Sequence, residues 1–282
     1  LLLLQRHDRK RIYDLFYQKP QPVVARSDTF EINERITADG SVVTSLDMNS
    51  AQHVVEAALA GGNYGAVAIC FLNSYANPAH EEQLANLIRE RFPDVFVTHS
   101  AEVTREFREY ERATTTTLSA YVQPVIDSYI SRLQDELDAR GYRRNFSIMQ
   151  SNGGRLPTEG IRRNAITSLY SGPAAGVMGA VRQAGISGFT DIITLDMGGT
   201  STDVCLIRDG RPDLSTETEI NGLPVRTPVI DIATIGAGGG SIIWVDDGGM
   251  LRVGPESTGA DPGPACYGRG GILPAVTDAH LV

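Results

Sequence analysis

Hydrophobic and polar positions in the first hundred residues predict a strand, a helix and a second strand. The apolar runs GAVAICFL (65–72) and DVFVTHS (94–100) are typical of buried strands. Between them, NPAHEEQLANLIRERF (77–92) predicts a helix with Asn77 as N-cap and Pro78 in its first turn. This order implies a right-handed parallel crossover. The preceding segment VVEAALA (54–60) has the pattern of a further helix.

One long helix is expected over residues 113–140, with Pro124 as a kink or a late start and Gly141 as the stop. Apolar residues recur there every three or four positions, as Leu118, Val122, Val125, Tyr129, Leu133 and Leu137. The segment SGPAAGVMGAVRQAG (171–185) predicts a second helix, whose small residues allow backbones to approach closely. We expect two lobes, with their boundary near the start of the long helix.

The second half of the chain reads mainly as strands. The segments 191–199 and 202–210 predict a hairpin, and FSIMQSNGG (146–154), PVIDIATIG (228–236) and IIWVDDGG (242–249) predict further strands. Glycine and proline dominate residues 246–271, so we expect mostly turns and loop there.

Charge and composition narrow the class of protein. The 282 residues carry a formal net charge of -9, with 41% hydrophobic and 21% charged residues, as in ordinary globular proteins. An acidic chain disfavours nucleic acid or an anionic membrane as the main partner. The opening LLLL is too short to span a bilayer. The first residue is not Met, which suggests a fragment of a longer, full-length protein.

The cysteines and histidines carry no recognisable site. Cys70, Cys205 and Cys266 form no CxxC pair, and the first two lie in apolar runs, so inert thiols in a reducing, cytoplasmic compartment are expected. The five histidines form no HxxxH or HExxH pair, which disfavours a zinc site.

The hairpin turn TLDMGGTSTDVCLI (194–207) carries the most chemistry. Gly198 and Gly199 leave backbone N–H groups free to converge on an anion, and hydroxyls follow at 200–202. Carboxylates would repel phosphate unless a metal lies between, so Asp196 is the candidate Mg²⁺ (or Mn²⁺) ligand. Asp203 caps the turn or orients an attacking water. The alternative is an ordinary hairpin with two turn-stabilising aspartates, although its polar turn is longer than a tight hairpin needs.

Two further segments are open to more than one interpretation. TIGAGGGSI (234–242) fails the dinucleotide fingerprint, because Ser241 replaces the third glycine and no helix pattern follows. It forms either a second backbone surface against a nucleotide or a plain strand connection.

EVTREFREYERATTTT (102–117) is read as a solvated, salt-bridged helix start, or as a polar cluster that enters a buried helix and lines a cleft.

Seven segments together resemble the hydantoinase A/5-oxoprolinase family over nearly the whole chain. They are LDMGGTSTDV, SGPAAGVMGA, TIGAGGGSI, GPESTGADPGPACYGRGG, VTDAHLV, RIYDLFYQKP and EFREYERATTTTLSAYV. The resemblance implies an α/β actin-like, sugar-kinase-type ATPase fold of the ribonuclease H-like kind, present here as a fragment. It also implies that residues 1–112 are the remnant of the family's N-terminal domain and 113–282 the first part of its hydantoinase A domain.

The activity that the resemblance implies is ATP-dependent hydrolysis of a cyclic amide, with ATP and Mg²⁺ as cofactors and a hydantoinase B-type partner subunit. Asp196 and Asp203 would be catalytic. The cofactor-binding residues would be Gly198, Gly199, Thr200, Ser201, Thr202, Gly236, Gly238, Gly239 and Gly240. An earlier Asp-x-Gly-Gly-Thr turn of the family is absent from this chain. Ala233 stands where many relatives have histidine, and His280 where they have asparagine, which leaves the substrate open.

Two other functions fit the same motifs. One is the phosphorylating subunit of an acetone or acetophenone carboxylase-type complex. The other is a nucleotide-binding module without catalysis. Product analysis with hydantoin, oxoproline and acetone, with and without bicarbonate, would separate the two enzymes, and ATP turnover that no small substrate stimulates would favour the module.

Overall fold

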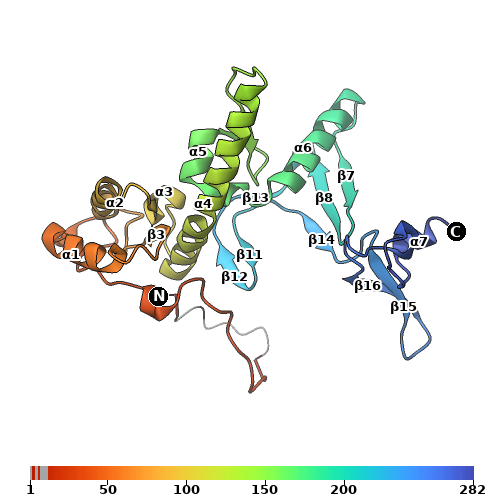
Figure 1. Ribbon diagram of the computed structural model, residues 1–282, viewed down its shortest axis with the longest axis horizontal. Coiled ribbons are helices and arrows are strands. Elements are labelled where there is room, and N and C mark those ends of the chain that lie inside the picture. The colour runs from red at the N-terminus through yellow and green to blue at the C-terminus, as the bar shows by residue number, and fades with distance from the viewer. Residues whose placement is uncertain (1, 4–5, 7–11) are drawn as a thin grey trace. The chain divides into compact units, whose positions relative to one another are not determined.

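A computed structural model describes residues 2–3, 6 and 12–282 of the chain (Figure 1). The chain divides into two compact units, each built from two stretches of sequence. The first comprises residues 1–171 and 216–229, and the second comprises 172–215 and 230–282. Both units contain helices and strands, so the expected α/β class is confirmed.

A parallel strand–helix–strand motif lies in the first unit, as the sequence predicts. Strand β3 (Ala66–Ile69) and strand β4 (Phe96–His99) pair in parallel, and helix α2 (Ala79–Arg91) connects them. The side-chain oxygen of Asn77 accepts the N–H of Ala79 at 3.1 Å, so the expected capping interaction is present.

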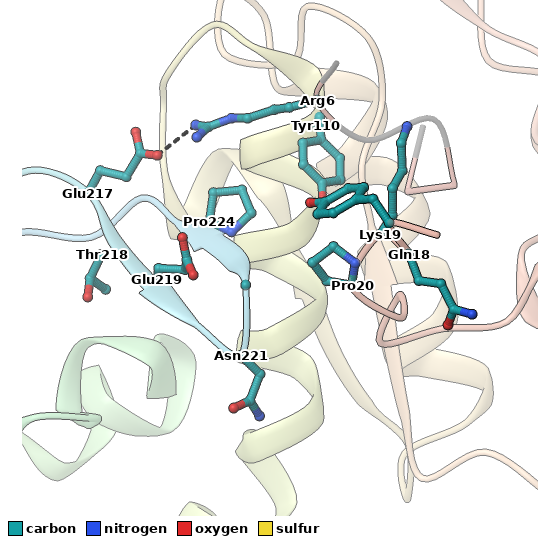
Figure 2. Close-up of a pocket in the computed structure, with 12 residues that line it drawn as sticks. Arg6, Gln18, Lys19, Pro20, Tyr110, Glu217, Thr218, Glu219, Asn221 and Pro224 are labelled. Carbon is teal, nitrogen blue, oxygen red and sulfur yellow. Dashed lines mark hydrogen bonds and ion pairs between the residues drawn. The ribbon is translucent and has the colours of Figure 1, made fainter. Parts of the chain in front are cut away.

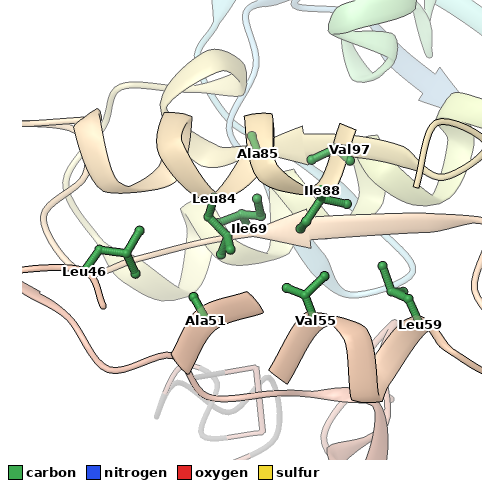
Figure 3. Close-up of a cluster of buried hydrophobic side chains, with 9 residues drawn as sticks. All are labelled: Leu46, Ala51, Val55, Leu59, Ile69, Leu84, Ala85, Ile88 and Val97. Carbon is green, nitrogen blue, oxygen red and sulfur yellow. The ribbon is translucent and has the colours of Figure 1, made fainter. Parts of the chain in front are cut away.

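The hydrophobic core of this motif lies between two helices. In Figure 3, side chains of α1 (Met48–Leu59) and α2 point toward Ile69 of β3 from opposite sides. On α1 the buried positions recur every four residues, so one stripe of the helix faces the core. The core residues are Leu46, Ala51, Val55, Leu59, Ile69, Leu84, Ala85, Ile88 and Val97.

The long helix α4 (Glu109–Ala139) begins four residues before the expected start and contains Pro124 in its interior. Gly141 follows it with φ +81°, and its N–H donates to the carbonyl of Asp138, as expected for a glycine stop. The helix packs against β3 and β4 as well as against later elements of the first unit. The long helix therefore lies within one unit. The boundary between the units is not at the start of this helix, contrary to the expectation from the sequence.

The first turns of α4 are buried and polar, so the expectation of a solvated helix start is wrong. Glu111, Arg112 and all four threonines at 114–117 are buried. The hydroxyls of Thr115, Thr116 and Thr117 each donate to the carbonyl four residues earlier, at 2.7 Å. This back-bonding satisfies hydroxyls that would otherwise be costly to bury.

The apolar stripe expected along α4 is buried only at its beginning. Leu118 packs with Ile166 and Val225 in a second small core, whereas Val125 is 70% exposed and Tyr129 is 52% exposed. At the start of the helix, the mainly polar segment 111–119 occupies buried positions that the periodic pattern predicted for apolar residues.

Short elements complete the first unit. Strands β11 (Thr218–Ile220) and β12 (Leu223–Val225) form a hairpin that packs on α4. The others are η1 (Arg26–Asp28), β1 (Arg35–Ile36), β2 (Val42–Thr44), α3 (Ser100–Val103), β5 (Ser147–Met149), β6 (Arg155–Pro157), α5 (Thr158–Arg163) and η2 (Ala165–Ser168).

The second unit is built around the predicted hairpin. Strands β7 (Ile192–Met197) and β8 (Thr202–Arg208) pair antiparallel, and β14 (Ala233–Ile235) and β9 (Arg211–Pro212) also pair with β8. The predicted small-residue helix is α6 (Ser171–Ile186), which lies beside this sheet (Figure 1).

Residues 246–271 contain a strand that the glycine and proline pattern did not reveal. Strand β16 (Leu251–Ser257) pairs antiparallel with β15 (Ser241–Val245). The carboxylate of Asp246 accepts the N–H groups of Gly248 and Met250, which closes the turn between them. The remaining elements are β10 (Leu214–Ser215), β13 (Val229–Ile230), η3 (Ala265–Tyr267) and α7 (Val276–Ala279).

Within the described part of the chain, no helix combines the length and the apolar character needed to cross a membrane. Residues 1, 4–5 and 7–11, which include part of the opening LLLL, lie outside that part.

Candidate functional site

The glycine turn lies between two carboxylates that face each other across the hairpin. Asp196 of β7 and Asp203 of β8 are direct partners in the antiparallel register, so both side chains lie on the same face of the sheet. Like charges placed opposite each other repel. The Oδ1 atom of Asp203 also accepts the hydroxyl of Thr234 at 2.8 Å, which orients this carboxylate from the neighbouring strand β14.

The turn itself is a four-residue loop, 198–201, closed by the Gly198 N–H donating to the Ser201 carbonyl at 2.8 Å. Gly198, Gly199 and Thr200 are exposed. No hydrogen bond within the described residues uses the backbone N–H groups of Gly199, Thr200 or Ser201. Exposed, unpaired donors on consecutive residues are suited to bind an anion.

Thr202 differs from the other predicted phosphate ligands because it lies in β8 and is buried. Its hydroxyl donates to the carbonyl of Ala237 at 2.6 Å. This hydrogen bond holds the second glycine segment against the hairpin. A contact between Thr202 and phosphate therefore has no support from this geometry and stays a prediction.

The second glycine cluster packs directly on the turn. The N–H groups of Gly239 and Gly240 donate to the carbonyls of Gly198 and Gly199, at 2.9 and 2.6 Å. A Cβ atom at Gly238 would lie 2.7 Å from both the Gly198 carbonyl oxygen and the Ser201 nitrogen, so only glycine fits. The two segments thus form one joined surface. Whether this surface lies against a nucleotide, as one of the two interpretations of residues 234–242 expects, stays a prediction.

Two threonines later in the chain hold the second glycine cluster in place through hydrogen bonds to its carbonyl groups. The N–H and the hydroxyl of Thr277 both donate to the Gly239 carbonyl, at 2.8 and 2.7 Å. The N–H and the hydroxyl of Thr258 both donate to the Gly240 carbonyl, at 2.8 and 3.1 Å. Both residues lie within motifs of the family resemblance, but the motifs alone do not reveal these contacts.

The carboxylate of Asp278 binds backbone groups of the loop that precedes it in the sequence. It accepts the N–H groups of Ala275, Cys266 and Ala265. The hydrogen bond with the Cys266 side chain and those with the backbone lower the pKa of the Asp278 carboxyl to about 2. The same contact raises the pKa of the Cys266 thiol. Burial raises the pKa of the Cys70 and Cys205 thiols.

A cavity of about 260 Å³ lies over the two carboxylates, between the sheet and α6. Its helical wall consists of Pro173, Gly176, Val177 and Ala180. A Cβ atom at Gly176 would lie 3.7 Å from Oδ2 of Asp196. The small residues of α6 therefore leave open space in front of Asp196.

The donor set in this cavity fits a magnesium ion that also binds phosphate. Mg²⁺ takes one or two protein carboxylates and completes its shell with water and phosphate oxygens. Asp196 and Asp203 supply two carboxylates on one face. Among the described residues, no group of three or more His, Cys, Asp or Glu side chains is placed to hold a metal alone.

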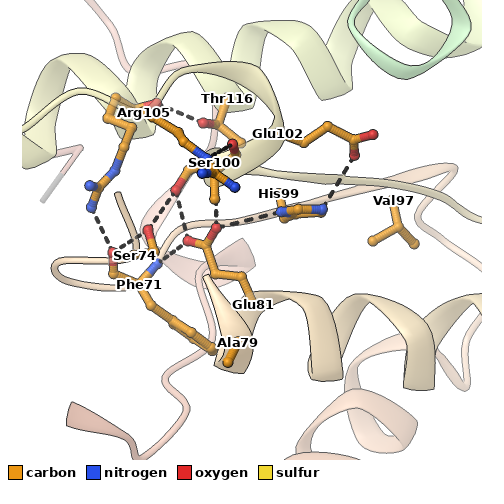
Figure 4. A network of polar contacts seen from close by, with 12 residues as sticks. Phe71, Ser74, Ala79, Glu81, Val97, His99, Ser100, Glu102, Arg105 and Thr116 are labelled. Atoms are coloured by element: carbon orange, nitrogen blue, oxygen red, sulfur yellow. Dashed lines mark hydrogen bonds and ion pairs between the residues drawn. The ribbon is translucent and has the colours of Figure 1, made fainter. Parts of the chain in front are cut away.

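A second polar cluster lies at the carboxyl ends of β3 and β4, in the first unit (Figure 4). The buried carboxylate of Glu81 accepts the Phe71 N–H and the Ser100 hydroxyl, both at 2.7 Å, and the Ala101 N–H at 2.9 Å. Burial alone would raise the pKa of Glu81, but the His99 ring, 3.7 Å away, and hydrogen bonds from the two backbone N–H groups and Ser100 lower it below its usual value. The carboxylate ties both strand ends together.

The structure is a mixed α/β chain with a glycine turn between paired carboxylates, and comparison with known proteins gives its family. The hydantoinase/oxoprolinase family model matches residues 112–282, and the model of that family's N-terminal region matches residues 1–92. The chain belongs to the hydantoinase/oxoprolinase family. The resemblance found in the sequence is thus confirmed.

Three relatives with described functions show the range of this family. Caprolactamase subunit alpha of Pseudomonas jessenii is 40% identical over 95% of this chain and 38% of its own length. The acetophenone carboxylase gamma subunit of Aromatoleum aromaticum is 35% identical over 94% of this chain and 37% of its own length. A 5-oxoprolinase of Pestalotiopsis fici is 40% identical over 87% of this chain and 19% of its own length.

The crystal structure of the ATP-dependent caprolactamase from Pseudomonas jessenii matches the fold with a TM-score of 0.83 and 38% identity. The match covers 99% of this chain and 40% of that chain. The present chain therefore spans about two fifths of the length of the caprolactamase and carboxylase subunits that it matches.

Proposed function

We propose that the full-length protein uses ATP to hydrolyse a cyclic amide, and that the hairpin turn of this chain binds part of the nucleotide. The observation that carries the proposal lies between Asp196 and Asp203: Gly199 and Thr200 are exposed, and their N–H groups have no hydrogen-bond partner among the described residues. The similarity to a caprolactamase subunit and to a 5-oxoprolinase supports a cyclic amide as the substrate.

The reaction needs ATP because an amide carbonyl is resonance-stabilised and resists water. In the proposed sequence, the carbonyl oxygen attacks the γ-phosphorus, and the bond to the β-phosphate oxygen breaks to release ADP. Water then adds to the activated carbon, and the ring nitrogen leaves with the C–N electron pair and takes a proton. A second water cleaves the resulting acyl phosphate to a carboxylate and inorganic phosphate.

The roles of the residues follow from their positions. The N–H groups at 199–201 and the hydroxyls of Thr200 and Ser201 would bind phosphate oxygens and spread their charge. Asp196 would hold Mg²⁺, which supplies charge neutralisation for the phosphates when bound. Asp203, oriented by Thr234, would accept a proton or position water.

The actin-like, sugar-kinase-type ATPase fold is part of this proposal. In support, the chain forms two compact units, and one of them places an acidic glycine turn at the end of a hairpin. In such a fold the nucleotide phosphates lie against turns of this kind. The other glycine positions, 236 and 238–240, would then shape the turn and its surroundings.

A second candidate is the ATP-using subunit of a ketone carboxylase. The similarity to the acetophenone carboxylase gamma subunit favours it. The same phosphate-binding turn would then activate a ketone enol or bicarbonate instead of an amide. Because both relatives are named as subunits, we propose that a hydantoinase B-type partner completes either enzyme.

The test is ATP hydrolysis by the full-length protein, produced with and without the partner subunit. Hydantoin, 5-oxoproline, ε-caprolactam and acetone are added in turn, with and without bicarbonate. Amide-dependent release of ADP together with a ring-opened amino acid supports the first proposal. Carboxylated product formed only with bicarbonate supports the second. ATP turnover that no compound stimulates contradicts both.

Asp196→Asn should abolish the stimulated turnover, whereas Asp247→Asn is the matched control. Asp247 is an exposed carboxylate of the same unit, in the connection between β15 and β16. Equal loss in both variants would show that the assignment of Asp196 is wrong.

A further inference from the structure

The cavity between α6 and the hairpin sheet adjoins the turn at 198–201, because the two aspartates that flank the turn line it. All of its lining residues belong to the second unit, as the turn does, whereas the cavity of about 480 Å³ in Figure 2 belongs to the first unit. In the proposed reaction the amide carbonyl oxygen attacks a phosphorus atom held at the turn, so the amide must lie next to the turn. The cavity of about 260 Å³ over the aspartates has that position.

This cavity is acidic at one end and apolar at the other. Gly176 lies at the acidic end, since its Cβ atom would be 3.7 Å from Oδ2 of Asp196. Helix α6 ends at Ile186 and β7 begins at Ile192, so a short connection reverses the chain. Ala180 and Ile192 therefore line the end that lies away from Asp196. The other apolar side chains of the helix and of the strand connection that line the cavity include Val177 and Ile232.

The polar groups that a ligand could reach in this cavity are carboxylates. Its eleven lining residues, all within the described part of the chain, include no Lys, Arg or His. The hydroxyl of Thr194 is already engaged, because it accepts the N–H of Cys205 at 3.2 Å and donates to the carbonyl of that residue at 3.4 Å. Asp196 and Asp203 remain, and ionised carboxylates only accept hydrogen bonds.

Such a lining disfavours a ligand that carries its own carboxylate. Mg²⁺ bound at the aspartates would neutralise them, but the nucleotide phosphates at the turn restore an excess of negative charge. A carboxylate on the ring would meet this charge without a side-chain cation, and burying it among apolar walls is costly. An uncharged ring of methylene groups with one amide avoids both costs.

We propose that this cavity binds the ring of an uncharged lactam, with the amide at the acidic end and the methylene groups against Val177, Ala180 and Ile192. The inference rests on the proposed function and narrows its substrate class to a cyclic amide without a carboxylate. In this orientation the ring N–H donates to a carboxylate and the carbonyl faces the turn. Ala180, at the apolar end, limits the size of the ring.

A matched pair of substrates tests the charge of the ring. The compounds 2-pyrrolidinone and 5-oxoproline share a five-membered lactam ring and differ by one carboxylate. We expect the kcat/KM of the full-length protein to be about tenfold or more higher for 2-pyrrolidinone. Equal values, or a preference for 5-oxoproline, would overturn the narrowed substrate class.

A matched pair of variants tests the position of the ring. Ala180→Leu fills the apolar end, whereas Ala175→Leu makes the same change at an exposed position of the same helix, outside the cavity. We expect Ala180→Leu to raise the KM for the seven-membered ε-caprolactam about tenfold, and that for the smaller 2-pyrrolidinone less than threefold. The KM for ATP should stay unchanged, and Ala175→Leu should leave all three values unchanged.

The dependence on ring size separates a filled cavity from a general loss of structure. If the KM for ε-caprolactam is unchanged in Ala180→Leu, or if it rises equally for both rings, the cavity assignment is wrong. If Ala180→Leu melts well below Ala175→Leu, the smaller change Ala180→Val takes its place under the same criteria.

Binding distinguishes failure of this inference from failure of the proposed function. If the wild-type protein turns over no cyclic amide, the proposed function fails, and saturation-transfer NMR with ε-caprolactam in the presence of Mg·ADP decides the cavity alone. A signal in the wild type and in Ala175→Leu that is lost in Ala180→Leu supports the cavity. No signal in the wild type, or a signal that persists in Ala180→Leu, overturns it.

Discussion

The close contact at Gly238 gives the sharpest test of how the two glycine segments are joined. In Gly238→Ala, the new Cβ atom would lie 2.7 Å from the Gly198 carbonyl oxygen, 2.7 Å from the Ser201 nitrogen and 2.8 Å from the Gly199 carbonyl carbon. Ordinary contact begins at 3.4 Å, so each atom is about 0.6 to 0.7 Å too close. All three belong to backbone, which cannot turn away as a side chain does.

The free energy that Gly238→Ala costs follows from these contacts. Overpacking of this kind costs about 1–3 kcal/mol. Moving the segment away also weakens the hydrogen bonds from Gly239 and Gly240 to the turn, at about 0.5–1.5 kcal/mol each. Replacing glycine by alanine also stabilises the protein by about 0.4–1 kcal/mol, because it lowers the conformational entropy of the unfolded chain. We therefore expect Gly238→Ala to destabilise the joined segments by about 1–5.6 kcal/mol.

Hydrogen exchange of the peptides that cover residues 194–202 and 234–242 measures this locally, and urea unfolding measures it for the whole chain. Gly236→Ala is the matched control in the same segment, because its Cβ atom would meet only Cβ of Pro255, at 3.8 Å. That variant should be neutral or slightly more stable. If the two variants differ by less than about 0.5 kcal/mol, the direct packing of these segments is refuted.

The remaining predictions concern binding, pH, thiols and turnover. Asp196→Asn should weaken Mg·ATP binding by about 1–3 kcal/mol in calorimetry of the full-length protein, and an unchanged affinity would contradict the metal assignment. Because the folded pKa of Glu81 is lowered, its contribution to stability is present above its unfolded pKa, near 4.5, and is lost as the pH falls through the folded value. Glu81→Gln should lose about 1–3 kcal/mol at pH 7 and flatten that acid limb in urea titrations, and an acid limb as steep as that of wild type would exclude this role. Iodoacetamide should modify the exposed Cys266 and leave turnover intact, whereas inactivation that substrate prevents would make a cysteine catalytic. The 282-residue chain alone should unfold cooperatively yet hydrolyse ATP only at background rate, and turnover comparable with that of the full-length protein would show that the catalytic groups all lie within it.

Local patterns in the sequence were enough to predict several elements correctly. Apolar runs with a capped helix between them define β3, α2 and β4, because a continuous apolar strand and a 3.6-residue period are signals within a short window. The hairpin around Gly198 and the helix α6 were predicted for the same reason. The seven motifs were also sufficient to assign the family.

Burial was decided by tertiary structure. The threonines at 114–117 have poor helix propensity and look solvent-exposed in sequence, yet they are buried inside the first unit. The hydroxyls of Thr115, Thr116 and Thr117 bond back to the carbonyls of their own helix, which offsets the cost of burying them. Strand β16 was missed because its glycine- and proline-rich neighbours hide a pairing that only the partner strand β15 supplies.

In the candidate site, too, some features could be predicted from local sequence and others depend on tertiary structure. The residue types of the turn and its two aspartates could be read from the sequence, because a glycine pair between carboxylates is a local pattern. The register that sets Asp196 opposite Asp203, and the roles of Thr234, Thr258 and Thr277, could not. The threonine contacts join residues that are 18 to 38 positions apart. Only folding brings their backbone groups within hydrogen-bond distance, so the sequence determined the chemistry available and the tertiary structure decided where it was placed.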